Sequence, residues 1–564
     1  MAQFEVPFLV VGAGPVGMIE ALLLAHRGRR CFVAERRAGP QTAPAAHVVN
    51  ARTFEICRQA GLDMAAVEAA CKRPEDAGHV RFVTRLAGES IGHLPFERQG
   101  EECLRFTPTP LRNLSQHRFE PILVEALRKE PNIDLRYGWQ WEESRQDASG
   151  VSSTLRDLDS GERHEVRSRY VIAADGAGSR VRRSLGIEMQ GPPRLESFLM
   201  IHFGANLREI VRDRPGVLHF VMDPEVRGAF IAHDIDREWV FMHGFDPDAE
   251  SEDDFDDARC RELVSNAIGC EVPLEILHKG SWHMSSQVAD GMRKERIFLA
   301  GDAAHRFPPT GGLGLNSGFQ DAHNLAWKLC AVEDGWAPPA LLDTYAAERL
   351  PVAHENTQQS LKNALKMVLL PQALGTDTEP TRARIEAALA DPQTRAAAEV
   401  AVQEQAEHFD MLGLQLGYIY GAGALVPEGT PPKLESARDY VPTAHPGARL
   451  PHAWIDVAGE RRSTLDLIEG DGLTLLSVGA HEAWADAIVE AGDVPIRLVR
   501  MGNDFQFSDD ERSDDGWRTT CGLDSNGALL IRPDQHVAWR APTLPDAPRT
   551  ALESALTHIL GEPT

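Results

Sequence analysis

The chain has 564 residues, of which 43% are hydrophobic, so its length predicts about three or four domains with large buried cores. Its 58 basic against 84 acidic residues give a net charge of -26, which disfavours nucleic acid and anionic membranes as partners. The eight cysteines show no metal-binding or redox spacing, no basic region precedes the first apolar strand, and no apolar run approaches about 18 residues. We therefore expect a cytoplasmic protein without a metal site or a membrane span.

The first stretch predicts the start of a dinucleotide-binding fold. An apolar strand ends at Val11, and a helix reaching about Ala25 follows. Three glycines in the G-x-G-x-x-G pattern lie between them: Gly12, Gly14 and Gly17. Such glycines allow a tight turn and a close approach of backbone to a pyrophosphate.

A second strand, 31–35, completes this unit and ends in Glu35. An acid at this place accepts hydrogen bonds from an unphosphorylated ribose, so FAD and NAD both remain open. Arg36 and Arg37 follow, and either could lie along the adenine or pyrophosphate. For Arg37 we prefer the interpretation of a solvated side chain.

Two polar segments come next. His47 lies in a loop before an amphipathic helix that runs to about Ala60. A loop histidine beside a redox cofactor can take a proton from a phenol, although an isolated histidine more commonly bonds only to backbone. Further on, Gln116 precedes a helix with Pro121 in its first turn and is placed to donate its amide to a ligand.

The order of strand, polar turn and helix recurs twice. Strand 170–174 leads to Asp175 and then to the basic cluster 180–183, which is either solvated or receives the phosphate of a second dinucleotide. Strand 297–300 leads to Asp302, a Pro- and Gly-rich turn, and a helix starting near Asn316. The unpaired N–H groups of a helix start attract polar or anionic ligands, but an ordinary glycine-rich loop is an equal alternative for this stretch.

In order and spacing, these three strand-end motifs resemble the three signatures of class A flavoprotein aromatic hydroxylases. Ala46-His47 with Asn50, and the stretch 321–329, further resemble the phenol and chlorophenol hydroxylase branch. The resemblance implies non-covalently bound FAD, NADPH or NADH as reductant, and a homodimer. It also implies hydroxylation of a small phenolic substrate with O2 through a flavin C4a-hydroperoxide.

The same resemblance assigns site residues. His47 would take the phenolic proton, and Pro309 would offer its carbonyl to the substrate hydroxyl. The cofactor-binding residues would be Gly12, Gly14, Gly17, Glu35, Arg36, Gln116, Asp175, Asp302, Gly314, Leu315 and Asn316. Two positions depart from many relatives: Ala45 replaces an arginine or lysine, and Met292 lies where an aromatic residue is common.

The rest of the chain completes an α/β fold. Strands at 216–222, 228–233 and 238–243 are expected to cover the flavin, with His219, His233 and His243 facing either a pocket or solvent, an ambiguity shared by Trp282-His283. The expected parts are a Rossmann-like FAD-binding domain (1–75, 110–190 and 291–345), an interleaved β-sheet substrate domain (76–109 and 191–290), a helical segment (346–425), a linker (426–451) and a thioredoxin-like C-terminal domain (452–564). The last resembles the C-terminal domain of the same hydroxylases but has no redox motif at Cys521.

Three alternatives accompany this interpretation. The substrate could be a larger polycyclic or polyketide phenol, because such oxygenases share every motif above. A flavin-binding regulatory or scaffold protein is the alternative from another class. A flavin halogenase is disfavoured, because Trp139-Gln-Trp141 does not continue into the Trp-x-Trp-x-Ile-Pro motif.

Overall fold

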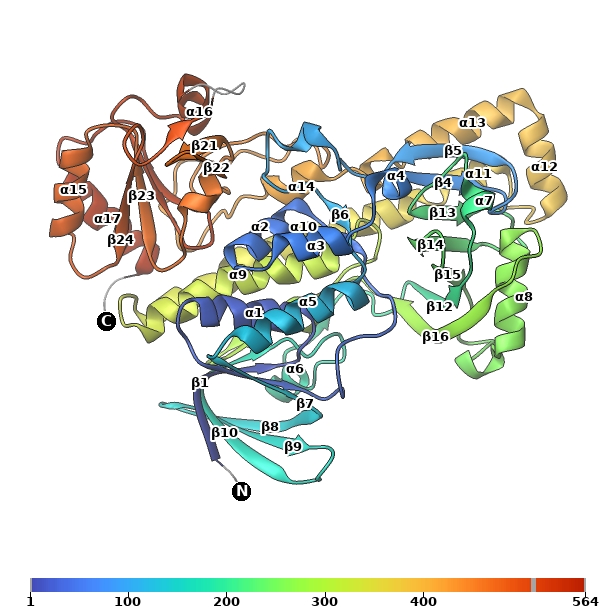
Figure 1. Cartoon of the computed structure of the whole chain (residues 1–564), viewed down its shortest axis with the longest axis horizontal. Helices are drawn as coiled ribbons and strands as arrows, with labels where there is room; N and C mark the ends of the chain where they lie inside the picture. Colours follow the sequence, from blue (N-terminus) through green and yellow to red (C-terminus); the bar gives the residue numbers. More distant parts are fainter. Residues whose placement is uncertain (1–2, 509–513, 562–564) are drawn as a thin grey trace.

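The computed structural model describes residues 3–508 and 514–561, so residues 509–513 and 562–564 of the expected C-terminal domain lie outside the described residues. Its elements form three groups along the long axis (Figure 1). A central sheet with β1 and β10 lies between a second sheet containing β12 to β16 and a C-terminal sheet containing β23. Helices and sheets alternate through the chain, which confirms the predicted α/β class.

The central sheet is built on adjacent parallel strands. In spatial order these are β19 (Ile297–Leu299), β10 (Arg163–Ala173), β1 (Gln3–Val11), β2 (Cys31–Glu35) and β7 (Ile133–Tyr137). Antiparallel strands extend the sheet: β18 (Arg293–Lys294), β8 (Trp139–Asp147) and β9 (Gly150–Asp157). The strand ending at Val11 and the strand 31–35 were both predicted from their apolar runs.

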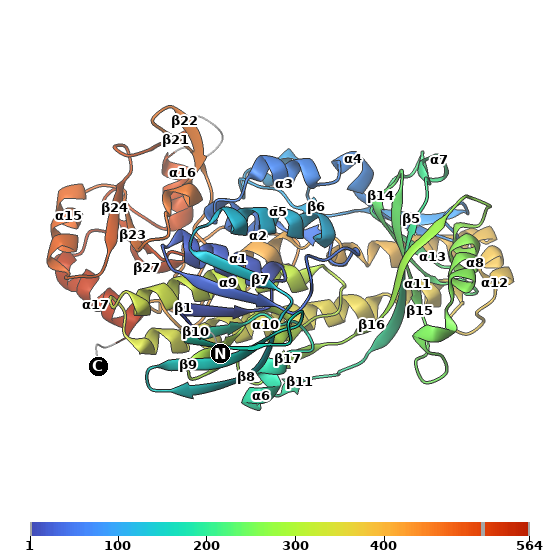
Figure 2. The same ribbon diagram turned by 60° about the horizontal axis from the view of Figure 1, so that its bottom comes forward.

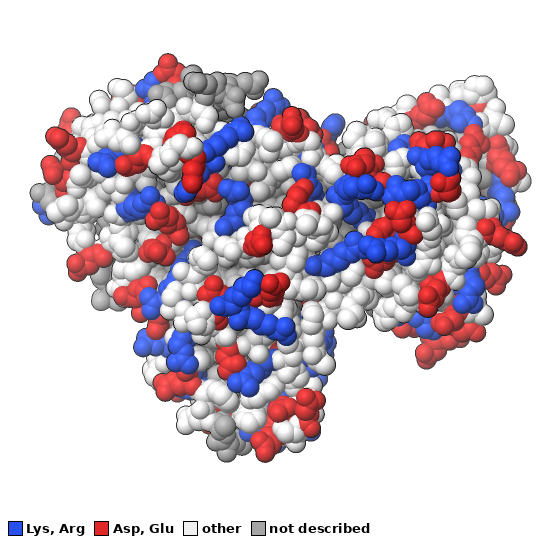
Figure 3. All heavy atoms as spheres, in the orientation of Figure 1, with Lys and Arg blue, Asp and Glu red and all other residues white. Residues whose placement is uncertain are grey.

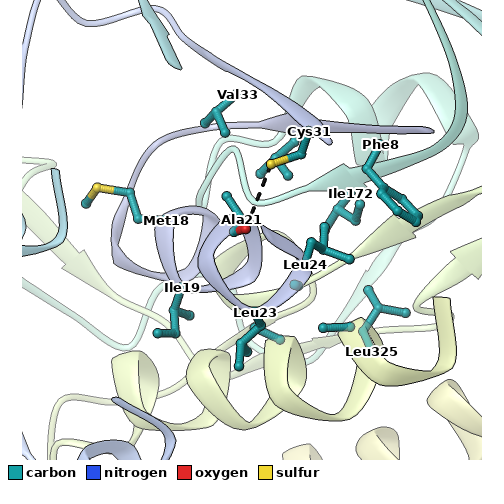
Figure 4. Close-up of a cluster of buried hydrophobic side chains, with 14 of the residues drawn as sticks. Phe8, Met18, Ile19, Ala21, Leu23, Leu24, Cys31, Val33, Ile172 and Leu325 are labelled. Carbon is teal, nitrogen blue, oxygen red and sulfur yellow. Dashed lines mark hydrogen bonds between the residues drawn. The ribbon is translucent and has the colours of Figure 1, made fainter. Parts of the chain in front are cut away.

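Helix α1 (Pro15–His26) packs between this sheet and α9 (Leu313–Glu333), as Figure 4 shows. Phe8 and Ile172 from the strands, Leu24 from α1 and Leu325 from α9 are all fully buried. The thiol of Cys31 lies 3.8 Å from the carbonyl oxygen of Ala21. Burial of each large apolar side chain contributes about 1.5–3 kcal/mol, so this layer fixes the sheet against the helix whose start forms part of the site.

The central group has further helices and strands. They are β3 (Val48–Val49), α2 (Ala51–Gln59), α3 (Met64–Ala70), α4 (Pro74–Ala77), β6 (Arg112–Asn113), α5 (Gln116–Lys129), α6 (Arg180–Leu185), β11 (Met189–Gln190), β17 (Gln287–Ala289) and β20 (His305–Arg306). Helix α5 begins at Gln116, so Gln116 lies within the helix and Pro121 lies inside it, not in its first turn as expected. Proline there removes one backbone hydrogen bond, a cost that the buried side chains of the helix offset.

The second sheet lies at one end of the molecule. Its strand order is β16 (Glu275–Met284), β12 (Glu196–Gly204), β15 (Glu238–Gly244), β14 (Gly228–Asp234), β13 (Leu218–Val221), β4 (His79–Val83) and β5 (Ser90–Pro95). Apolar side chains of α8 (Asp257–Ile268) share a core with one part of the sheet. Those of α11 (Leu369–Leu374), α12 (Arg382–Ala390) and α13 (Pro392–Gln403) share a second core with β4 and β5. The three antiparallel strands predicted between 216 and 243 are present.

Helix α10 (Thr344–Lys366) runs beside α9, and the C-terminal group packs against the C-terminal end of α9 (Figure 2). The C-terminal elements are β21 (Trp454–Val457), β22 (Glu460–Ser463), β23 (Leu473–Ser477), α15 (His481–Glu490), β24 (Ile496–Arg500), β25 (Gln506–Phe507), α16 (Asp514–Cys521), β26 (Ala528–Ile531), β27 (Val537–Ala541) and α17 (Pro548–Leu560). Trp327 of α9 is buried in the same cluster as Leu473 and Trp484. The C-terminal group is therefore anchored on the helix that begins at the site.

Basic and acidic side chains are intermixed over the face shown in Figure 3, with no broad basic surface. Within residues 3–508 and 514–561, no helix has the length and apolarity needed to cross a bilayer. The same ranges contain no group of three or more His, Cys, Asp or Glu side chains arranged to hold a metal ion.

Candidate active site

The three predicted strand-end turns meet at one edge of the central sheet. Val11 of β1 pairs with Ala173 of β10, and Ala173 pairs with Leu299 of β19. The strands are parallel, so the turns that follow them emerge side by side. This edge is where open α/β sheets bind their ligands.

The three glycines of the first turn have different physical roles. Gly12 has φ of +105°, and a Cβ there would lie 2.3 Å from the carbonyl oxygen of Ala174. A Cβ on Gly17 would lie 2.0 Å from the carbonyl oxygen of Gly12. At Gly14 a Cβ would meet no atom within 4 Å. Gly12 and Gly17 are therefore required by the fold, whereas Gly14 faces space that a ligand can fill.

Glu35 lies beside this turn. Its Oε2 accepts the N–H of Ala13 at 2.8 Å, and its Oε1 accepts the N–H of Arg37 at 2.9 Å. The Arg37 guanidinium donates to Glu35 Oε1 at 3.2 Å and to the carbonyl of Ala13 at 3.3 Å. The expectation of a solvated Arg37 was wrong, because Arg37 supports the turn, while Arg36 is exposed. Among the described residues, Oε2 of Glu35 accepts only the N–H of Ala13, so it keeps acceptor capacity for a ribose hydroxyl.

Two aspartates offer acceptor atoms at the other turns. Asp175 Oδ2 accepts the N–H groups of Arg180 at 2.8 Å and Val181 at 3.2 Å, whereas its Oδ1 is buried and has no partner among the described residues. Asp302 is exposed in a recess with no hydrogen bond within the described part of the chain, and the surrounding protein raises its pKa by displacing water. The buried Oδ1 of Asp175 and the exposed carboxylate of Asp302 fit a ligand rich in hydroxyl groups.

The basic cluster after Asp175 does not form a single solvated face. Arg182 is buried and donates to the carbonyl of Ala303 at 2.9 Å, so it braces the third turn. Arg180 and Arg183 are exposed.

Helix α9 begins at Leu313, three residues earlier than predicted, because Gly312 ends the turn with φ of +64°. The N–H groups of Gly314 and Leu315 lie in the first helical turn and have no acceptor within an α-helix. The positive end of the helix dipole is also there, so this terminus fits negative charge on a ligand.

The side chain of Asn316 is fully engaged by the protein. Its Oδ1 accepts the N–H of Asn50 at 2.9 Å and the hydroxyl of Thr53 at 2.7 Å. Its Nδ2 donates to the carbonyls of Val48 at 3.0 Å and Gly312 at 2.6 Å. The Asn316 side chain therefore has no free donor or acceptor for a ligand, and it ties α9 to the loop of His47.

His47 and Pro309 face one cavity of about 610 Å³ between the central group and the second sheet. Its wall is mainly apolar and includes Val48, Phe96, Leu218, Phe220, Ile231 and Met242. Pro309 is exposed to the cavity, and its carbonyl already accepts the N–H of Gly312 at 3.0 Å, which leaves one lone pair.

Of the other histidine, tryptophan and methionine residues considered from the sequence, all within the described residues, only one lines the cavity. His243 lines the cavity, whereas His219 and His233 are buried in the sheet away from its wall. Met292 is buried in the central core and does not line the cavity. The pair Trp282-His283 also lies away from the cavity wall, with Trp282 stacked on Phe198.

His47 itself is buried, and its Nδ1 lies 3.0 Å from Oδ1 of Asn113. Burial, and then the charge of Lys72, lower the His47 pKa to about 4, and the bond to Asn113 opposes this shift only in part. The imidazole is therefore neutral at pH 7 and can accept a proton. Sequence patterns did not single out Asn113, because its relation to His47 depends on the pairing of the two-residue strands β3 and β6.

Comparisons with known proteins agree along the whole chain. A family model described as a FAD binding domain matches residues 5–360, and one described as aromatic-ring hydroxylase, C-terminal, matches residues 443–563. Tetracenomycin A2 monooxygenase-dioxygenase of Streptomyces glaucescens is 36% identical over 594 residues, covering 99% of this chain and 98% of that protein. For 2,4-dichlorophenol 6-monooxygenase of Delftia acidovorans the identity is 31% over 587 residues, with 99% and 98% covered. The crystal structure of the flavin-dependent monooxygenase PieE with FAD and substrate superposes with a TM-score of 0.92 at 33% identity, covering 100% of both chains.

Proposed function

The chain belongs to the FAD-binding aromatic-ring hydroxylases, and from this premise we propose that it hydroxylates a small phenolic substrate with O2, using NADPH or NADH as reductant. The observation that carries the proposal is that His47 and the turn from Pro309 to Gly312 face the same apolar cavity. A proton acceptor and the cofactor-facing turn therefore border the space in which a ring would bind.

We propose that the three strand-end turns hold FAD. When bound, FAD would accept electrons from the nicotinamide cofactor and activate O2. The buried Oδ1 of Asp175, the exposed carboxylate of Asp302, the open space at Gly14 and the helix start at Gly314 and Leu315 fit its hydroxyl, phosphate and ring groups. The full proposed set is Gly12, Gly14, Gly17, Glu35, Arg36, Gln116, Asp175, Asp302, Gly314, Leu315 and Asn316.

His47 is the proposed base. Before the reaction, the free lone pair on the Pro309 carbonyl oxygen would accept a hydrogen bond from the substrate hydroxyl and position it; the neutral imidazole of His47 would then take that same proton, which makes the ring more electron-rich. A pKa of about 4 lies about six units below that of an ordinary phenol, so full transfer in the resting complex is uphill by about 8 kcal/mol. We therefore expect the proton to move to His47 as the ring reacts. The apolar wall keeps water from competing for it.

A second candidate substrate class is a larger polycyclic or polyketide phenol. A cavity of about 150 Å³ is enough to hold benzene, whereas this cavity has about 610 Å³. Part of that volume, beside Gly311 and Gly312, is the proposed place of the flavin ring. The remainder favours a ligand larger than one unsubstituted ring.

Oxygen uptake by the FAD-loaded protein tests the function. NADH and NADPH are compared across a panel of single-ring and fused-ring phenols, and products are identified by mass spectrometry. Uptake stimulated by a phenol and matched by hydroxylated product supports the proposal, and the ring size of the best substrate separates the two substrate classes. A bound flavin that reacts with no phenol would instead support the regulatory or scaffold alternative.

We also propose the domain division given above, a thioredoxin-like C-terminal domain, a homodimer and a cytoplasmic location. The C-terminal sheet β24-β23-β26-β27, flanked by α15 and α17, supports the thioredoxin-like assignment. The absence of a redox motif at Cys521 favours a structural role for this domain. Light scattering of the holoenzyme would measure the oligomeric state.

A further inference from the structure

Two buried amide side chains, those of Asn113 and Gln99, form a hydrogen-bonded series that begins at His47. Asn113 Oδ1 lies 3.0 Å from His47 Nδ1, and Asn113 Nδ2 lies 3.5 Å from Oε1 of Gln99. Gln99 Nε2 in turn lies 2.9 Å from the carbonyl oxygen of Phe96 and 3.2 Å from that of Ala77. Asn113 is fully buried and Gln99 nearly so.

The chemistry of these groups fixes the direction of every bond in the chain. Backbone carbonyls only accept, so the amide nitrogen of Gln99 must face Phe96 and Ala77. Its oxygen then faces Asn113, which must present its own nitrogen there. The oxygen of Asn113 is left for His47, so Nδ1 of His47 must carry the hydrogen.

We infer that Asn113, oriented by Gln99, is a positioning residue that fixes His47 as the Nδ1–H tautomer and leaves Nε2 unprotonated toward the cavity. Nε2 of His47 has no protein partner within residues 3–508 and 514–561, and His47 lines the cavity wall. The inference rests on the proposed base role of His47. The wrong tautomer would present an N–H to the phenol and could not take its proton.

The backbone holds the pair in place. Val48 of β3 pairs with Asn113 of β6, and the N–H of Leu114 donates to the carbonyl of His47 at 2.9 Å. The side chains of His47 and Asn113 therefore meet across two paired segments. A loop contact alone would not fix this distance.

A neutral amide also suits the charges around His47. Lys72, in the segment before α4, lowers the His47 pKa through its positive charge. The ring of His233 on β14 lies 5.8 Å from the His47 ring. Lys72 itself is influenced by Arg118 and by the acids Asp234 and Glu238. A carboxylate at position 113 would accept the same N–H but would stabilise protonated His47, whereas an amide orients the ring and leaves it neutral.

The first test needs no variant. The FAD-loaded protein is labelled with ¹⁵N-histidine, and the His47 signals are assigned by their loss in His47→Gln. We expect a protonated Nδ1 and an unprotonated Nε2 at neutral pH. The opposite tautomer in the wild-type protein would overturn the inference.

Variants test the role in the reaction. Asn113→Leu keeps the size but removes the acceptor, and we expect about a tenfold or greater loss of hydroxylation rate with flavin reduction unchanged. Asn113→Asp restores the acceptor, so hydroxylation should recover in part, while the acid limb of its pH profile moves up by about one unit or more. Asn266→Leu, at an exposed position of α8, is the matched control.

A second readout is the ionisation of bound 4-nitrophenol, followed by absorbance against pH in the oxidised holoenzyme. Its titration should move in Asn113→Asp and stay at the wild-type position in Asn266→Leu. Unchanged tautomer, unchanged pH profile and unchanged ionisation in both Asn113 variants would refute the positioning role. Unchanged hydroxylation in His47→Ala would instead refute the proposed base function, so the two failures are distinguishable.

Discussion

The side-chain oxygen of Asn316 lies 2.9 Å from the backbone nitrogen of Asn50, which joins the start of α9 to the start of α2. The same oxygen accepts the hydroxyl of Thr53, and the side-chain nitrogen donates to the carbonyl of Val48. Val48 follows His47 directly. One buried amide thus couples the position of His47 to the proposed flavin-facing helix terminus.

Replacing Asn316 should lower the stability of the fold and also the amount of hydroxylated product formed per reductant consumed. Asn316→Ala leaves the buried N–H of Asn50 and the Thr53 hydroxyl without their acceptor, and each such group costs about 1–3 kcal/mol. We expect the free energy of unfolding to fall by about 2–4 kcal/mol, and more reductant to be consumed per hydroxylated product. Urea denaturation and the ratio of product to oxidised NAD(P)H measure these effects. Asn266→Ala should change neither, and wild-type values in Asn316→Ala would refute the coupling.

Gly14 separates cofactor binding from folding. Gly14→Ala adds a methyl group where no protein atom lies within 4 Å, so the fold should keep its secondary structure. The methyl group would project into the proposed pyrophosphate space, and we expect FAD affinity to fall about tenfold or more, equivalent to about 1.4 kcal/mol or more. Circular dichroism and the flavin absorbance per protein measure the two effects. Gly291→Ala, also at an open position, is the control, and full flavin content in Gly14→Ala would contradict this assignment.

The residues show what sequence patterns can and cannot reveal. The three strand ends and the glycine-rich turn that begins at Gly12 are local features, and the pattern predicted them. The contact of Asn113 with His47 joins residues 66 positions apart, and that of Asn316 with Asn50 spans 266 positions. No periodicity encodes such contacts, because they depend on how whole elements pack.

Two expectations from the sequence differ from the structure. The start of α9 moved to Leu313 because two consecutive glycines allow the turn to close earlier, which residue propensity does not specify. Arg37 was expected to be solvated, but the turn at Ala13 and Glu35 provides partners for it. A local turn decided the first case, and tertiary partners decided the second.

The pH dependence of hydroxylation tests the state of His47. Its folded pKa is lowered to about 4 by burial and Lys72, so the neutral base persists as pH falls to about that value. We expect the acid limb of the hydroxylation step near pH 4, and no limb near the ordinary value of about 6.5. Stopped-flow single turnovers with product analysis measure this step separately from flavin reduction.

His47→Ala provides the complementary test. Loss of a positioned base should lower hydroxylation by about 10²-fold or more, with flavin reduction nearly unchanged. His278→Ala, at an exposed histidine of β16, is the control. Equal hydroxylation rates at neutral pH in His47→Ala and wild type would refute the base role.

A buried ionic cluster connects the C-terminal group to the helices of the site. Arg532 contacts Glu348 of α10 at 2.8 Å and Asp534 at 2.9 Å, and Lys328 of α9 contacts Glu348 at 2.9 Å. All four side chains are buried. Burial alone would raise the pKa of Glu348, but Arg532 and then Lys328 outweigh it and lower this pKa to about 2.

Arg532→Met should therefore destabilise the protein by about 3–5 kcal/mol, because it leaves two buried carboxylates with one cation. In the wild type, the stability from ionised Glu348 is present above the unfolded value of about 4.5 and is lost as pH falls toward 2. Without Arg532 the Glu348 pKa rises, so acid unfolding should begin at higher pH. Urea denaturation across pH 3–7 measures this shift, and limited proteolysis should show faster cleavage within 426–451 as the C-terminal group loosens. Lys129→Met, which breaks an exposed pair with Glu125, should leave both measurements unchanged. An unfolding midpoint equal to that of the wild type would show that apolar packing around Trp327 alone holds the C-terminal group on α9.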